Sequence, residues 1–140
     1  MVSIVMTLLL ACGTAKDDTA GEGGGEDTAG GGASPDVAPE VISVERAVCT
    51  QQQSAGEVWD VQIAVDDPQG AATVRSGSFD VLNAQGGVLA SAQALACGNG
   101  MCFGSMRADT TGVTCAVDAS FRFVVNDTDG NASDPYTHTP

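Results

Sequence analysis

The strongest constraint on how this chain folds is a strict alternation of apolar and polar residues in two of its segments. In residues 58–65 every second residue is large and apolar, namely Trp59, Val61, Ile63 and Val65. In residues 120–126 the same alternation puts three large apolar residues on one side of the chain, namely Phe121, Phe123 and Val125. A period of two is typical of a β-strand with one face buried and the other in water. The sequence therefore predicts two core strands, and no segment shows a helical period.

Short runs rich in valine, isoleucine and phenylalanine recur between clusters of turn-forming residues, which is the pattern of strands joined by turns. This pattern predicts further strands at residues 41–48, 76–82, 88–95, 101–107 and 113–117, with a last one within 133–139. A hairpin loop is expected at Asn83-Ala84-Gln85-Gly86-Gly87. About seven strands at this spacing predict an all-β fold, an immunoglobulin (Ig)-like antiparallel β-sandwich. A small open barrel is the alternative.

Acidic turns follow both alternating segments. The first is followed by Asp66-Asp67-Pro68-Gln69-Gly70, and the second by Asn126-Asp127-Thr128-Asp129-Gly130-Asn131. A valine-rich strand that ends in such a turn resembles bacterial Ig-like domains of the PKD and cadherin-like type. The resemblance spans about 100 residues, the size of one domain, and implies an Ig-like sandwich. The antibody-domain signature is absent, because Trp59 lies on the wrong strand relative to the cysteines.

The first residues resemble the export signal of a bacterial lipoprotein. Residues 2–11 form an almost unbroken apolar run, far shorter than the ~20 residues that a helix needs to cross a bilayer. This length fits the apolar region of a signal peptide. Leu9-Leu10-Ala11-Cys12 resembles the lipobox, which implies removal of residues 1–11 and lipidation of Cys12, with palmitate as a typical acyl group. Gly13 stands where an aspartate would retain the protein in the inner membrane, so the outer membrane is expected.

A second interpretation of the N-terminus stays open. No lysine or arginine precedes the apolar run, although signal peptides normally carry positive charge there. Gly13-Thr14-Ala15 also offers a site for an ordinary signal peptidase. Cleavage after Ala15 would remove Cys12 and leave a secreted soluble β domain. Both interpretations place the mature protein outside the cytoplasm.

Residues 13–35 are rich in glycine, acidic residues, threonine and alanine, and they include no aromatic and no branched aliphatic residue. Such a segment cannot bury enough surface to offset the entropy lost on ordering. It is expected to be a disordered tether with a span of about 25 Å. Three parts are therefore predicted: a signal peptide at 1–11, the lipidated Cys12 with a disordered linker at 12–36, and the Ig-like domain at 37–140.

Four of the five cysteines fall in the strand-rich part, namely Cys49, Cys97, Cys102 and Cys115. In an exported domain they are expected to form two disulfides. Sequence proximity favours Cys97 with Cys102, which leaves Cys49 with Cys115. A four-cysteine zinc site is the rival interpretation, but the close paired spacings of a zinc ribbon are missing.

Charge and histidine content narrow the classes of function. The chain has 18 acidic and 5 basic residues, which argues against nucleic-acid binding, because phosphates require clustered lysine and arginine. The only histidine is His138, two residues from the end. A nucleophile activated by an oriented histidine is therefore not expected. The sequence predicts no catalytic residues and no enzyme.

One group of residues is a candidate metal site. Oxygen ligands alternate around Gly130 as in half of a calcium loop, the residues being Asp127, Asp129, Asn131 and Asp134. Asp66 or Asp67 could complete the set if both acidic turns lie at one end of the sandwich. A plain turn between the last two strands explains the same residues. Apart from this calcium ion, no cofactor is expected.

These observations favour a non-enzymatic, exported lipoprotein that is anchored to a membrane. Its Ig-like module would bind a protein or glycan of the cell envelope, or space envelope components, by analogy with other domains of this architecture. The alternatives are a calcium-dependent binding module and a secreted soluble β domain. The expected partners are the membrane, through the lipid, and an envelope protein or glycan whose identity the sequence does not indicate.

Overall fold

The computed structural model describes residues 37–140, so the predicted signal peptide, Cys12 and the linker lie outside the described residues. The described part contains seven strands and one turn of helix. They are β1 (Glu40–Gln52), β2 (Gly56–Asp66), β3 (Ser76–Leu82), β4 (Val88–Gly98), β5 (Met101–Arg107), α1 (Ala108–Thr111), β6 (Ser120–Asn126) and β7 (Tyr136–His138). Each predicted strand overlaps one of these, except the strand predicted at residues 113–117.

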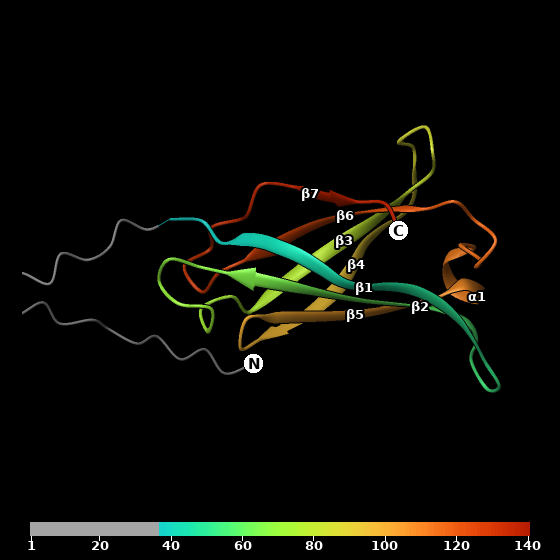
Figure 1. The fold of residues 1–140 in the computed structure, drawn as a ribbon, viewed down its shortest axis with the longest axis horizontal. Helices are drawn as coiled ribbons and strands as arrows, with labels where there is room; N and C mark the ends of the chain where they lie inside the picture. Colours follow the sequence, from blue (N-terminus) through green and yellow to red (C-terminus); the bar gives the residue numbers. More distant parts are fainter. Residues whose placement is uncertain (1–36) are drawn as a thin grey trace, which may run out of the picture. The chain divides into compact units, whose positions relative to one another are not determined.

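The strands are ordered β1-β2-β5-β4-β3-β6-β7, and all neighbours pair antiparallel. β1, β2 and β5 pair side by side in one half of the domain. β4 pairs with β3 over most of its length and with β5 only from Ala96 to Gly98, so β4 belongs with β3, β6 and β7 in the other half (Figure 1). Two antiparallel groups of strands that share one core are the architecture of an Ig-like sandwich. The predicted Ig-like antiparallel sandwich of seven strands is confirmed.

The continuous sheet folds back on itself, because side chains from distant strands meet. The ring centroids of Trp59 on β2 and Phe121 on β6 lie 5.2 Å apart, although three strands separate β2 from β6 in the sheet order. In a flat sheet these two strands would be about 19 Å apart. The two halves therefore face each other across one hydrophobic core.

The alternation predicted for β2 and β6 is confirmed. The apolar residues on one side of each strand are buried, namely Trp59, Val61, Ile63, Val65, Phe121, Phe123 and Val125. Phe121 is central among the aromatic rings, since its centroid also lies 6.1 Å from that of Phe79 and 6.3 Å from that of Phe123. A few large side chains therefore fill the middle of the sandwich in a chain that is only 4% aromatic.

The predicted hairpin loop between β3 and β4 is also confirmed. The side-chain oxygen of Asn83 accepts hydrogen bonds from the N–H groups of Gln85 and Gly87, at 3.0 and 2.8 Å. Gly86 has a φ of 78°, a left-handed conformation that glycine adopts without a steric penalty. The asparagine and the glycine together fix the turn that joins β3 to β4.

The strand predicted at residues 113–117 is wrong. After α1 the chain passes through Gly112, whose φ is 77°, and follows an irregular path to β6. This path carries the chain from β5 in one half to β6 in the other, so its backbone cannot pair within either half. Val113 is nevertheless buried, and Cys115 is bonded to Cys49 of β1. The residues of this segment are apolar because the crossover is partly buried, and not because the segment forms a strand.

Candidate functional site

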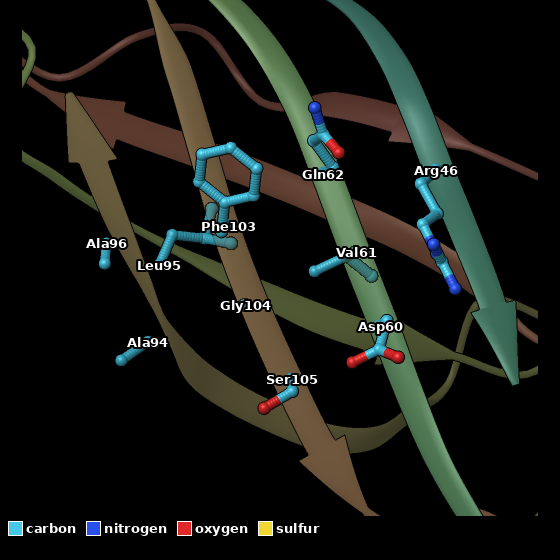
Figure 2. Close-up of a pocket in the computed structure, with 10 residues that line it drawn as sticks. All are labelled: Arg46, Asp60, Val61, Gln62, Ala94, Leu95, Ala96, Phe103, Gly104 and Ser105. Atoms are coloured by element: carbon cyan, nitrogen blue, oxygen red, sulfur yellow. The ribbon is translucent and has the colours of Figure 1, made fainter. Parts of the chain in front are cut away.

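A hollow of about 620 Å³ lies on the outer surface of the sheet, next to the point where the pairing of β5 with β4 ends at Phe103 and Ala96. Its volume is in the range of small-molecule sites. Its lining consists of Arg46 from β1, Asp60, Val61 and Gln62 from β2, Ala94, Leu95 and Ala96 from β4, and Phe103, Gly104 and Ser105 from β5. Figure 2 shows that these side chains rise from four neighbouring strands, with the ring of Phe103 among them.

Strand pairing places Phe103 in a row of side chains that crosses this face. Gln62 lies directly opposite Arg46 on one side and opposite Phe103 on the other. Ala96 lies opposite Phe103 on the far side. Side chains directly opposite one another in an antiparallel sheet have Cβ atoms about 4.5–5.5 Å apart. The aromatic ring therefore has a polar neighbour on β2 and a small one on β4 (Figure 2).

Phe103 is a large apolar side chain that remains in water. It is 52% exposed, whereas the three other phenylalanines are at most 1% exposed. A single exposed apolar residue is ordinary on a protein surface. Here the ring lies in a hollow, and its neighbours Ala94 and Ala96 are too short to cover it. The ring is thus open to a ligand that enters the hollow.

The strand beneath the hollow lies close to the core. A Cβ atom on Gly104 would be 2.8 Å from Cδ2 of Leu95 and 2.9 Å from Cε1 of Phe79. Such contacts are shorter than real Cβ atoms make, so a larger residue would have to displace core side chains. Glycine lets β5 pack against Leu95 and Phe79 next to Phe103, and these core contacts hold the floor of the hollow in place.

The polar side chains of the hollow are uncommitted. Two ion pairs occur within residues 37–140, and neither includes Arg46 or Asp60. The side chains of Gln62 and Ser105 likewise form no hydrogen bond with any residue in that range. The hollow thus presents a guanidinium, a carboxylate, an amide and a hydroxyl, which together can donate to and accept from a polar ligand.

The residues predicted as calcium ligands take other roles. One carboxylate oxygen of Asp127 accepts hydrogen bonds from the N–H groups of Asp129 and Asn131, at 2.9 and 2.8 Å. The other accepts one from Nδ2 of Asn131, at 2.8 Å. Burial raises the pKa of Asp127, but the hydrogen bonds from Asn131, Asp129 and Gly130 outweigh it and hold the pKa below its usual value. The carboxylate of Asp127 therefore stabilises the turn in which this residue lies.

No metal cluster is evident around this turn. Asp129 and Asp134 are exposed, and nowhere in residues 37–140 do three or more histidine, cysteine, aspartate or glutamate side chains group as metal ligands. The plain turn, given above as the alternative, accounts for the geometry. Calcium binding stays a prediction from the sequence.

The acidic turn after β2 is built in a similar way. Asp67 is buried, and its carboxylate accepts hydrogen bonds from the N–H of Gln69, at 2.8 Å, and from the hydroxyl of Thr73. The N–H of Arg75 donates to the carbonyl of Asn126 at 3.1 Å, so both acidic turns lie at the same end of the sandwich, as expected. Asp67, like Asp127, is used to support a loop.

The four cysteines of the domain form two disulfides. Cys97 is bonded to Cys102 and Cys49 to Cys115, which is the pairing that proximity favours. The first bond crosses the β4–β5 hairpin, where the two residues are directly opposite. The second joins β1 to the crossover before β6. No free thiolate is left among these cysteines, so the zinc interpretation is wrong.

The hollow depends on strand register, which is why its residues are not evident in any one segment. Within β5, Cys102 and Met106 are buried, so the residue between Cys102 and Gly104 must face outward. The alternation within β5 could therefore have shown from the sequence that Phe103 faces outward, which is unusual for a phenylalanine. Ser105 lies on the same strand, but Arg46 comes from β1 and Asp60 and Gln62 come from β2, and they meet Phe103 only because the strands pair in one particular register.

No protein-family model matches this chain, and no curated protein or solved structure matches it either. The fold itself defines the class, an Ig-like β-sandwich with two disulfides and a hollow on its outer surface around Phe103. None of the helices in the described part of the chain has the length and apolar character needed to cross a membrane. The hollow is the feature of the described residues that bears on the role of this protein.

Proposed function

We propose that this chain is a non-enzymatic, exported lipoprotein whose Ig-like domain binds a component of the cell envelope through the hollow around Phe103. Lipid on Cys12 would hold the chain at the outer membrane, and residues 12–36 would give the domain its reach. One observation carries the binding role: an exposed aromatic ring shares a hollow with four uncommitted polar side chains. Apolar surface with a few convergent polar groups is typical of ligand sites.

The chemistry of the hollow supports binding over catalysis. Asp60 is its only carboxylate, and its lining contains no histidine, cysteine or lysine. Acid–base and nucleophilic catalysis require a second titratable group within hydrogen-bond reach of the first. The hollow therefore suits a ligand that is held and not transformed.

Two features support export. The described cysteines form two disulfides, and such bonds persist mainly in oxidising compartments. The N-terminal residues also resemble a lipoprotein signal, with Cys12 as the acylated residue. Two or three acyl chains hold a protein at a membrane firmly, since each buried methylene contributes about 0.8 kcal/mol.

The anchor is tested by the intact mass of protein extracted with detergent from the bacterium that makes it. We expect a chain that begins at Cys12, carries acyl groups and gains four hydrogens when its two disulfides are reduced. A chain that begins at Lys16 without lipid would contradict the anchor. The protein would then be the secreted soluble domain of the alternative interpretation.

The binding face is tested with a variant of its central ring. Phe103→Ala is expected to weaken binding of the chain without its lipidated cysteine (residues 13–140) to isolated cell envelopes by about tenfold or more, because an aromatic anchor in a hollow carries much of the binding energy. Binding is measured by co-sedimentation over a range of protein concentrations. The matched control is Val88→Ala, since Val88 is also 52% exposed but lies outside the hollow. Equal binding by Phe103→Ala and the unmodified chain would contradict the proposal, as would equal losses in both variants.

A further inference from the structure

We infer that the ligand of this hollow is a neutral oligosaccharide that lies across the strands with one sugar ring stacked on Phe103. This inference rests on the proposed function, since it names the ligand of the same face. Three properties of the hollow carry it: the open aromatic ring, the mixture of hydrogen-bonding groups beside the ring, and the balance of charge.

The open ring suits the apolar face of a pyranose. The faces of an aromatic ring carry partial negative charge, and the C–H bonds on one side of a sugar ring are weakly positive. Phe103 is 52% exposed, and only short alanine side chains flank it on the β4 side. A flat sugar ring can therefore approach Phe103 without displacing another side chain.

The polar side chains suit hydroxyl groups, each of which can both donate and accept. Arg46 can only donate, Asp60 can only accept as a carboxylate, and Gln62 can do both. Gln62 lies directly opposite Phe103 in the sheet, so its amide can reach the rim of a stacked sugar. Hydrogen bonds in which one partner is charged are about twice as strong as neutral ones. Arg46 and Asp60, which lie on the neighbouring strands β1 and β2, therefore offer the stronger contacts on one side of Phe103.

Charge favours a neutral glycan over an acidic one. The lining contains one positive and one negative side chain, Arg46 and Asp60. Around it, residues 37–140 carry twelve acidic residues and only four arginines. The resulting negative field repels anionic polymers and does not oppose the approach of neutral ones.

The shape of the hollow favours a short oligosaccharide over a protein. The lining comes from four strands that are neighbours in the sheet, namely β1, β2, β5 and β4. Four neighbouring strands span about 14 Å, which is wider than a single sugar. A stable protein interface buries about 800 Å² on each partner and has a cluster of large anchors at its centre. Phe103 is the only large apolar side chain in the lining that is exposed. The lining therefore lacks the cluster of large apolar anchors that a protein partner would need.

The inference is tested by surface plasmon resonance with the full mature chain and three immobilised hexasaccharides: β-1,4-linked N-acetylglucosamine, β-1,4-linked glucose and α-1,4-linked glucose. We expect the chain to bind at least one of them. Phe103→Leu keeps an apolar side chain but removes the aromatic face, and should lower that affinity about tenfold or more. Phe103→Tyr keeps the ring and should stay within about threefold, and Val88→Ala should leave binding unchanged.

The outcomes separate this inference from the proposed function. If none of the hexasaccharides binds, or if Phe103→Leu binds as well as the unmodified chain, the glycan inference is overturned. In that event, an envelope interaction that still depends on Phe103 would leave the proposed function standing, with a protein as the ligand. An envelope interaction that is indifferent to Phe103 would end both.

Discussion

Replacing Cys49 and Cys115 together by alanine is expected to lower the free energy of unfolding by about 4 kcal/mol. The disulfide between them closes a loop with a sequence separation of 66 residues, and it restricts the unfolded chain more than a short loop would. It also joins β1, at the edge of the sheet, to the irregular crossover that precedes β6. Urea unfolding, followed by circular dichroism under non-reducing conditions, measures the loss.

The matched control removes the other disulfide. Cys97 and Cys102 are only five residues apart, so loop closure predicts a loss of about 2 kcal/mol, plus up to about 1 kcal/mol for the buried sulfur of Cys102. A larger loss for Cys97→Ala with Cys102→Ala than for the other pair would contradict this ranking. It would mean that strand geometry in the β4–β5 hairpin, and not chain entropy, dominates the effect.

Phe121→Ala is expected to destabilise the domain by about 3–5 kcal/mol, the usual range for deleting a buried phenylalanine. Phe121 is fully buried, and its ring meets Trp59 from the opposite half of the sandwich at 5.2 Å. The variant therefore removes one of the contacts between the two halves and leaves a cavity between them. The same urea experiment measures this loss.

Phe103→Ala is the control, because it deletes the same side chain from an exposed position on β5. Its effect on stability is expected to stay below about 1 kcal/mol. A loss similar to that of Phe121→Ala would show that Phe103 is structural, and it would remove the premise of the binding experiments. A loss below about 2 kcal/mol for Phe121→Ala would mean that the core closes around the cavity.

Much of the fold follows from local pattern. The alternation in β2 and β6 specifies which residues face the core, since a shift by one residue would expose every large side chain. The turn at Asn83 is likewise encoded locally, because the asparagine bonds its own backbone and the glycine supplies the left-handed conformation. The spacing of the cysteines favoured the observed disulfide pairing, because only Cys97 and Cys102 are close to each other in the chain.

Other features depend on contacts that no short segment encodes. Residues 113–117 have the composition of a strand, but the crossover between halves denies their backbone a partner, and tertiary context overrides the local preference. The acidic turn at Asp127 has the composition of half a calcium loop, yet its hydrogen bonds are made within the turn. The hollow around Phe103 depends on the register in which four strands pair. Alternation within each strand shows which residues face outward, but it does not determine that register.

The bond between Cys49 and Cys115 also determines how the domain yields to mechanical load. The chain enters the sandwich at Glu40, the first residue of β1, and β1 has only β2 as a neighbour in the sheet. A pull from that side would break the hydrogen bonds of β1 one after another, starting at Glu40. The peeling would stop at Cys49, because this residue is covalently joined to Cys115 beyond β5. Only the first part of β1, which carries Arg46 of the hollow, can therefore extend under force, while β2, β5 and β4 with the rest of the hollow stay folded behind the covalent stop.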